Sequence, residues 1–501
     1  MSTDDLLLAP STRLVHIGPF KTGTTALQNA FHACRAQMSA HGVHYAGEDT
    51  QPTFAALSVT GTRGRKGDRL PTDEDWSQLT TEVREAGDQR VVISSEFFSA
   101  ASSSAARRVV SEISGGPVHV VITLRSIAKI APSQWQQYVQ NGLRISFTSW
   151  LEAVLADPPD PTMTPTFWQR HDHAELVRRW TDVVGPENVT VVVIDEHDRS
   201  MTLRTFESFV GLPPGLLQTP DGAANRSLTA AESDVVRLIN QHFYDHDWSG
   251  TWNDETYGRY VRDGAVRRMR TQHRPGPDEP RLALPHWALQ RSSQIGAGVV
   301  QTLRSSGVRI VGDPSALCPD VPSDGAEHDE TGRVHHVPAM AAVHAVLGAM
   351  TGKRGARSGE KLAAALAANA AFPALGDQDL AAAWVPCADA AAAVVGAIEG
   401  RADLTQLAGL PPISAESAMS AAVAGTQRVQ SHDDDVKPVD PQTVTRVAQL
   451  LGVETADDKP TPLPQKVVSD VTARELLTVV LERGTRRLRK MLAASADRNG
   501  R

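Results

Sequence analysis

The chain has 501 residues and a formal net charge of -8, from 50 Lys and Arg against 58 Asp and Glu. Apolar residues make up 41% and charged residues 22%, the composition of an ordinary globular protein with chain enough for more than one domain. The acidic balance excludes a protein that coats nucleic acid, because neutralising phosphates needs an excess of Lys and Arg.

The cysteines and the apolar stretches indicate the compartment. Cys34, Cys318 and Cys387 are too few and too dispersed for a disulfide framework or a CxxC metal site. The N-terminus lacks the basic region of a secretory signal. The most apolar later stretch, 380–398, is interrupted by Pro386 and is not a membrane span. These features predict a cytoplasmic protein.

The predicted elements alternate between strands and helices along the first 200 residues. An apolar run at 13–18 is followed by a helical pattern, in which Leu27, Phe31, Cys34 and Met38 recur at steps of three and four. Further strands are predicted at 90–94, 118–124 and 189–194, and helices near 102–113, 127–141 and 170–184. Consecutive apolar, β-branched residues are typical of strands buried on both faces. The sequence therefore predicts a three-layer α/β domain with a central parallel sheet.

The composition changes after residue 320. We predict an α/β domain over 1–320, a linker over 321–337, and an Ala-rich, mainly helical extension over 338–501 with a disordered polar stretch at 430–466. The extension could pack on the first domain, form an independent module, or join copies of the chain into a homo-oligomer.

The most informative stretch is the turn between the first strand and the first helix. Its glycines, Gly18 and Gly23, have the spacing of a phosphate-binding loop at a helix N-terminus. The Walker motif would place a lysine directly after the second glycine, but Thr24 stands there and the lysine lies inside the loop, at Lys21. The loop predicts an anion site of a different kind from that of the nucleoside triphosphatases.

Two segments resemble sulfotransferases that use 3′-phosphoadenosine 5′-phosphosulfate (PAPS). The first is similar to their 5′-phosphosulfate loop and runs Phe20, Lys21, Thr22, Gly23, Thr24, Thr25. The second is similar to their 3′-phosphate motif, with Arg125 ending an apolar strand and Ser133 eight positions later. Ser126 and Ile127 replace the acidic residue and proline that usually follow this arginine. The resemblance covers about residues 13–320 and implies a P-loop-like fold.

The resemblance also implies roles for three further charged groups. Glu96 follows the strand at 90–94, where the carbohydrate-type branch has a glutamate as general base; the alternative for Glu96 is a helix cap. Lys21 would stabilise the transferring sulfuryl group and the leaving phosphate. Arg226 lies where sulfotransferases often return a basic residue to the nucleotide. The alternative for Arg125 is a capping or salt-bridge arginine.

The expected activity is transfer of a sulfuryl group from PAPS to a hydroxyl of a carbohydrate, glycolipid or small molecule, with release of adenosine 3′,5′-bisphosphate (PAP). No metal is expected, because Lys21 and main-chain dipoles supply the positive charge. Two alternatives stay open: a P-loop kinase-like phosphotransferase, which would bind ATP with magnesium, and a non-catalytic nucleotide-binding or scaffold protein.

Overall fold

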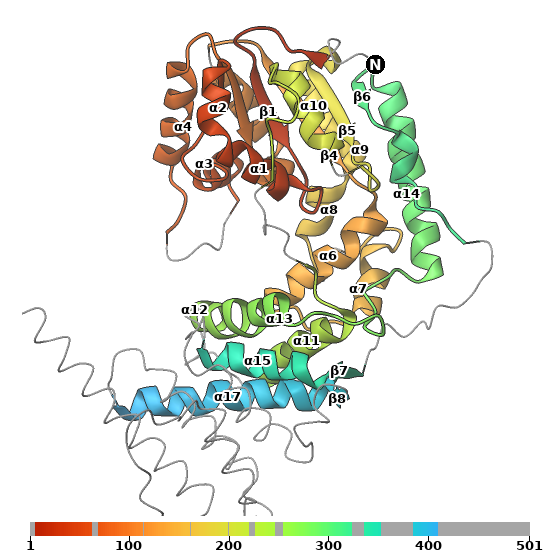
Figure 1. The fold of residues 1–501 in the computed structure, drawn as a ribbon. Helices are drawn as coiled ribbons and strands as arrows, with labels where there is room; N and C mark the ends of the chain where they lie inside the picture. The colour runs from red at the N-terminus through yellow and green to blue at the C-terminus, as the bar shows by residue number, and fades with distance from the viewer. Residues whose placement is uncertain are drawn as a thin grey trace, which may run out of the picture. The chain divides into compact units, whose positions relative to one another are not determined.

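A computed structural model describes residues 6–62, 69–113, 115–160, 162–198, 200–219, 226–245, 254–322, 335–351 and 384–408. The chain divides into two compact units (Figure 1). The first consists of Met1–Gln137, Ile145–Asn225 and Leu282–Gly332; the second of Tyr138–Arg144, Arg226–Arg281 and Arg333–Arg501. The predicted polar stretch at 430–466 lies outside the described residues.

The first unit is built on one six-stranded sheet in the order β2-β3-β1-β4-β5-β6, in which every neighbouring pair is parallel. The strands are β1 (Arg13–Ile17), β2 (Val43–Tyr45), β3 (Arg90–Ser94), β4 (Val118–Leu124), β5 (Val189–Val193) and β6 (Arg309–Val311). The α/β class and the parallel sheet are confirmed, and the four strands predicted from apolar runs are β1, β3, β4 and β5. The short strands β2 and β6 were not predicted.

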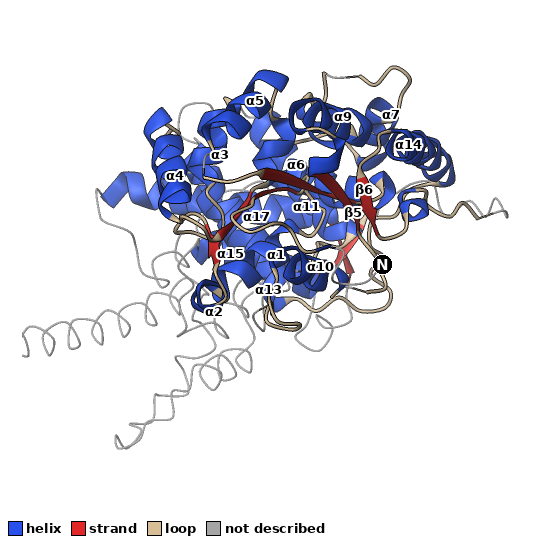
Figure 2. Ribbon diagram, turned by 90° about the horizontal axis from the view of Figure 1, so that it is seen from above, coloured by secondary structure: helices blue, strands red, loops and turns tan. Residues whose placement is uncertain are grey.

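Helices cover both faces of this sheet (Figure 2). On one face lie α3 (Thr53–Thr60), α4 (Asp73–Glu85), α5 (Ser103–Glu112), α9 (His173–Val184) and α14 (His286–Ser305). On the other face lie α1 (Thr24–Ala33), α2 (Arg35–Ala40) and α10 (Met201–Val210). The strand side chains alternate between two apolar clusters: Val15 belongs to the first and Leu14 to the second. This alternation makes consecutive residues of a strand apolar.

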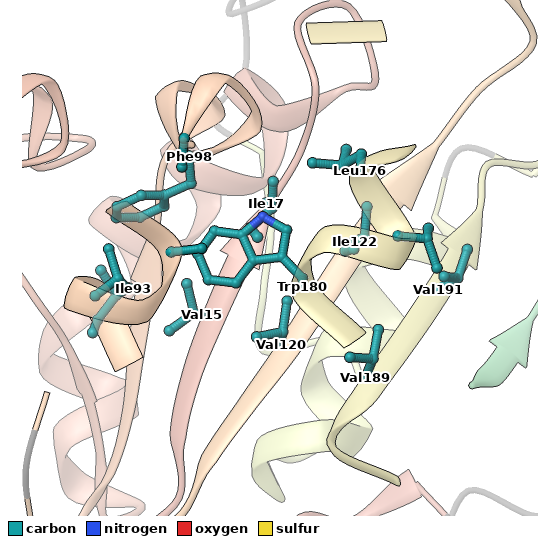
Figure 3. Packing of buried hydrophobic residues seen from close by; sticks show 14 of the residues in the cluster. Val15, Ile17, Ile93, Phe98, Val120, Ile122, Leu176, Trp180, Val189 and Val191 are labelled. Carbon is teal, nitrogen blue, oxygen red and sulfur yellow. The ribbon is translucent and has the colours of Figure 1, made fainter. Parts of the chain in front are cut away.

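Trp180 lies at the centre of the first cluster. It comes from α9 and is fully buried, and Figure 3 shows its indole among Val15, Val120, Ile122 and other strand side chains. Burying such a side chain contributes about 3 kcal/mol from the hydrophobic effect. The packing fixes α9, and with it the segment that enters α9 from α8 (Thr166–His171).

The described part of the second unit is mainly helical. It contains α11 (Ala230–Asp245), α12 (Asp254–Tyr257), the π-helix η4 (Gly258–Val266), α13 (Arg267–Gln272), α15 (Ala339–Thr351) and α17 (Cys387–Ala408). Residues 226–281 thus join the C-terminal helices, whereas the sequence analysis placed them in the first domain. The physical reason is packing: α15 lies against η4 so closely that a Cβ on Gly264 would come within 2.5 Å of the Gly348 oxygen.

Two similar strand-helix pieces make up the part of this unit that is described after residue 333. In each, a Val-Pro pair ends a short strand and a helix follows: β7 (His336–Pro338) before α15, and β8 (Trp384–Pro386) before α17. The two strands pair antiparallel, with Val337 opposite Val385. The same residue type thus meets at the centre of the pairing. None of the described helices is both long and apolar enough to cross a bilayer.

Candidate functional site

Three neighbouring strands each deliver one predicted site residue at the same edge of the sheet. β1 lies between β3 and β4, and all three run parallel. Lys21 follows β1, Glu96 follows β3 and Arg125 directly follows β4. The carboxyl ends of parallel strands are where open α/β sheets bind ligands. These groups, up to 104 residues apart in sequence, therefore share one edge.

The loop after β1 is shaped for an anion. Lys21 and Gly23 have left-handed backbone conformations, with φ of 70° and 80°. Gly23 precedes α1, and no side chain caps this end of the helix and no acidic residue lies in its first turn. The Ala26 amide donates to the Gly23 oxygen at 3.1 Å. The positive end of the helix dipole, with no carboxylate beside it in the first turn, favours a negatively charged ligand. Thr25 is exposed in this turn.

The two other loop threonines point inward and hold the loop to the sheet. Thr22 Oγ1 donates to the Pro19 oxygen at 2.8 Å and lies 3.0 Å from Thr123 Oγ1 on β4. Thr24 Oγ1 donates to the Gly18 oxygen at 3.3 Å. Both threonines are buried. Both hydroxyls therefore hold the loop to the sheet, and the predicted contact of the loop threonines with phosphate stays a prediction.

Gly18 is required by the same packing. A Cβ at this position would lie 2.3 Å from Thr24 Oγ1 and 2.9 Å from Thr123 Oγ1. Only a hydrogen fits there, because real Cβ contacts are longer.

A buried histidine that the sequence analysis did not single out lies under the loop. His16 on β1 is hydrogen-bonded to Ser94 Oγ on β3 at 2.8 Å and to Thr123 Oγ1 on β4 at 3.3 Å. Burial lowers the pKa of His16 to about 3, so the imidazole is neutral at pH 7. A histidine inside an apolar strand was the only sequence signal for this network.

The carboxylate of Glu96 is held by two glutamine side chains. Gln51 Nε2 donates to Oε1 at 3.1 Å and Gln28 Nε2 donates to Oε2 at 3.3 Å. Glu96 is the first residue of the 3-10 helix η2 (Glu96–Ala100), but Ser95 Oγ is the group that accepts from the Phe97 amide and caps it. The carboxylate is therefore positioned by side chains of α1 and of the segment before α3, and the helix cap is another residue.

Arg125 is bound on both sides in the ligand-free chain. Its Nη1 donates to the Lys21 main-chain oxygen at 3.2 Å, which ties the two predicted phosphate motifs together. Its Nε and Nη2 form a forked ion pair with Glu196, with 2.7 Å between Nη2 and Oε2. The salt-bridge alternative for Arg125 is thus present, while the capping alternative is not, since Ser126 Oγ accepts from the Ala128 amide. Ser133 lies half-buried on α6 (Ile127–Gln140).

A further cation next to the loop comes from α8. The Arg170 guanidinium lies over the Phe20 ring, 4.3 Å from its centroid, and the same ring packs edge-on against Phe97 at 5.5 Å. The neighbouring His171 is buried, and burial together with the charges of His173, Arg170 and Lys21 holds its pKa well below the usual value. Nothing in the sequence around 166–171 marked these residues, because they reach the loop only through tertiary packing.

Arg226 belongs to the second unit, and its contacts there are structural. The guanidinium forms a two-pronged ion pair with Glu232, whose side chain is fully buried, and also donates to the Met269 oxygen at 2.7 Å. The structure therefore gives Arg226 a packing role, and its predicted contact with nucleotide stays a prediction. Among the described residues, no group of three His, Cys, Asp or Glu side chains is placed to hold a metal ion.

Comparisons with known proteins add one structural similarity. No protein-family model matches the chain, and no curated protein matches it. The chain is similar to a solved structure, a sulfotransferase from Alicyclobacillus acidocaldarius, at 17% identity and a TM-score of 0.29; the alignment covers 50% of this chain and 100% of the other.

Proposed function

We propose that this protein is a PAPS-dependent sulfotransferase that acts on a hydroxyl of a carbohydrate, glycolipid or small-molecule acceptor. The observation that carries the proposal is the placement of Lys21, Glu96 and Arg125 after three adjacent parallel strands. A cation inside an uncapped anion loop, an arginine beside it and a carboxylate across from it are the groups that sulfuryl transfer needs. PAPS, when bound, supplies the transferable sulfuryl group.

The residues around the loop fit the two anionic ends of this donor. The uncapped first turn of α1 would hold the 5′-phosphosulfate, because it offers N–H groups with no competing carboxylate. Arg125 would hold the 3′-phosphate, since its fork can bind a phosphate with two parallel hydrogen bonds. Both are expectations from the sequence.

The chemistry follows from charge placement. Glu96 accepts the proton of the acceptor hydroxyl, and its two glutamine partners keep the carboxylate oriented while it does so. Lys21 stabilises the negative charge that develops on the leaving phosphate. Lys21 lies inside the loop, so its ammonium group would supply positive charge to the bound donor without a magnesium ion.

Two measurements test this proposal. Calorimetric titration is expected to show PAP binding that does not need magnesium, and ATP binding that is weaker; binding of ATP only with magnesium would instead favour a kinase-like protein. Transfer of labelled sulfate from PAPS to a panel of glycans and alcohols is the activity test. A Glu96→Gln variant should lose about 100-fold or more in turnover with PAP affinity nearly unchanged.

The matched control is Glu187→Gln, the same change at the exposed opposite end of the sheet, just before β5. It should leave turnover unchanged. Full activity of Glu96→Gln would remove Glu96 from the mechanism, and no sulfate transfer to any acceptor together with no PAP binding would overturn the proposed function.

A further inference from the structure

The first unit contains a cavity of about 680 Å³ that the proposed chemistry does not use. One wall is a single face of α14, formed by Arg291, Ile295, Gly298, Val299 and Thr302 at helical spacing. The opposite wall comes from the end of α7 (Phe147–Val154), the following loop, α8 and the start of α9. We call it the α14 cavity. Its volume lies within the range of small-molecule sites, roughly 300 to 1,000 Å³.

Hydrogen bonds from side chains to main-chain oxygens fix the walls of the α14 cavity. Trp168 Nε1 donates to the Val154 oxygen at 2.8 Å, which holds the indole as part of the wall. Arg291 Nε donates to the Leu155 oxygen at 3.2 Å and joins α14 to the end of α7. Val299 belongs to the apolar cluster under the sheet. A cavity with such walls is formed before a ligand arrives, which lowers the cost of ordering on binding.

Apolar side chains line the interior of the α14 cavity, and acidic side chains lie at its rim. Val154, Pro165, Ala174 and Ile295 line it together with the Trp168 indole. Two exposed carboxylates, Asp160 and Asp172, stand at the rim. The one cation among the lining residues, Arg291, is paired with Asp157 at 3.0 Å.

The carboxylates of Asp160 and Asp172 are exposed, and one oxygen of each accepts hydrogen bonds within the chain. Asp160 Oδ1 accepts from the amide and hydroxyl of Thr162, and Asp172 Oδ1 accepts from the Glu175 amide at 3.0 Å as the cap of α9. Both carboxylates add negative charge at the rim of the cavity. An anionic ligand would meet repulsion here, and a cationic one attraction.

We propose that the α14 cavity binds a small molecule with an apolar, ring-sized body and a protonated amine. The apolar body lies between Trp168 and the Gly298 face of α14, and the amine lies at Asp160 and Asp172. This site is separate from the anion loop, since none of the loop residues lines it, and its existence does not depend on the proposed function. The helix α8 contributes to both places, since it carries Trp168 on the cavity and Arg170 beside the loop.

The test uses three probes with one body and three head groups: phenylbutylamine, phenylbutanol and phenylbutyrate. Saturation-transfer NMR and calorimetry with the full chain should show that the amine binds about tenfold more tightly than the carboxylate, with the alcohol between them. Asp172→Asn should reduce that preference, while asparagine keeps the helix cap.

Gly298 provides the decisive variant. A Cβ here meets nothing within 4 Å, so Gly298→Leu can place its side chain in the cavity without a clash, and the change favours the helix. Gly298→Leu should abolish amine binding, while the matched control Gly298→Ala should retain it. Circular dichroism checks that both variants are folded. Amine binding that survives in Gly298→Leu, no binding of any probe, or equal binding of amine and carboxylate would each overturn the proposal.

Discussion

The main-chain oxygen of Lys21 accepts a hydrogen bond of 3.2 Å from Nη1 of Arg125, so the two phosphate motifs are in contact through the chain itself. The other side of the same guanidinium is engaged by Glu196. The guanidinium of Arg125 is therefore held in place by these contacts, and Glu196 partly neutralises its charge. A phosphate that binds here has to share the arginine with Glu196 or displace it.

Removing the Glu196 charge is expected to strengthen nucleotide binding. Both side chains are about a quarter to a third exposed, at 26% for Arg125 and 36% for Glu196, so the competition amounts to about 1 kcal/mol or less. Glu196→Gln should thus raise PAP affinity about threefold, and Arg125→Ala should lower it about 10-fold or more. AMP, which lacks the 3′-phosphate, is the control ligand in calorimetry. An Arg125→Ala variant that loses both ligands equally would contradict this assignment.

Lys21 has a charged side chain and a strained backbone conformation. Two substitutions separate the effect of the charge from the effect of the strain. Its φ of 70° costs about 1 kcal/mol for a residue with a Cβ. Lys21→Gly should therefore be more stable than Lys21→Ala by about 1 kcal/mol in chemical denaturation. Both variants lack the ammonium group and should lose about 100-fold or more in sulfuryl transfer. Equal stability of the two would mean that the loop relaxes without strain.

Acid should destabilise the first unit through buried histidines. Burial lowers the pKa of His16 to about 3 and that of His173 to about 4 in the folded chain, whereas the unfolded groups titrate near 6.5. At pH values between the folded and unfolded pKa, the unfolded state binds more protons than the folded state does. The stabilisation is therefore complete above pH 6.5 and is lost as the pH falls toward 3, by up to about 1.4 kcal/mol per pH unit for each histidine. Urea unfolding at several pH values measures the slope.

His16→Asn isolates one of these contributions. The variant should show a shallower loss of stability between pH 6.5 and 4, because one titrating group has been removed. An unchanged slope would mean that His16 is already protonated or is exposed in the folded chain.

Gly18→Ala should displace the loop between β1 and α1. The added methyl group would approach Thr24 Oγ1 and Thr123 Oγ1 more closely than packed atoms allow, so the loop has to shift. We expect a loss of about 1 to 3 kcal/mol in the free energy of unfolding and weaker PAP binding. Gly298→Ala, in open space on α14, is the control and should be neutral or stabilising. Unchanged PAP binding in Gly18→Ala would contradict the tight fit.

The sequence predicted the sheet well because its strands are buried on both faces. Continuous runs such as Val118–Leu124 have no other common explanation in a soluble fold. The strand β2 has only three residues and β6 carries Arg309, so neither has such a run. Lys21, Glu96 and Arg125 could be found because each stands next to a clear strand.

The supporting residues could not be found in that way. Gln28 and Gln51 are ordinary polar residues until folding brings their amides to Glu96. Arg170 reaches Phe20 only because Trp180 fixes the position of α9, which follows α8. The placement of 226–281 depended in the same way on packing between helices far apart in sequence.

The division of the chain into interleaved stretches limits how it can be shortened. The first unit uses three separate stretches, so no single cut releases it whole. A chain ended at residue 320 would keep α11 and η4 but lose α17 and α15, which pack against them. The uncovered apolar faces would then meet water and favour aggregation. A minimal form of this protein would instead need the 226–281 segment replaced by a short connection and the C-terminal part removed in the same step.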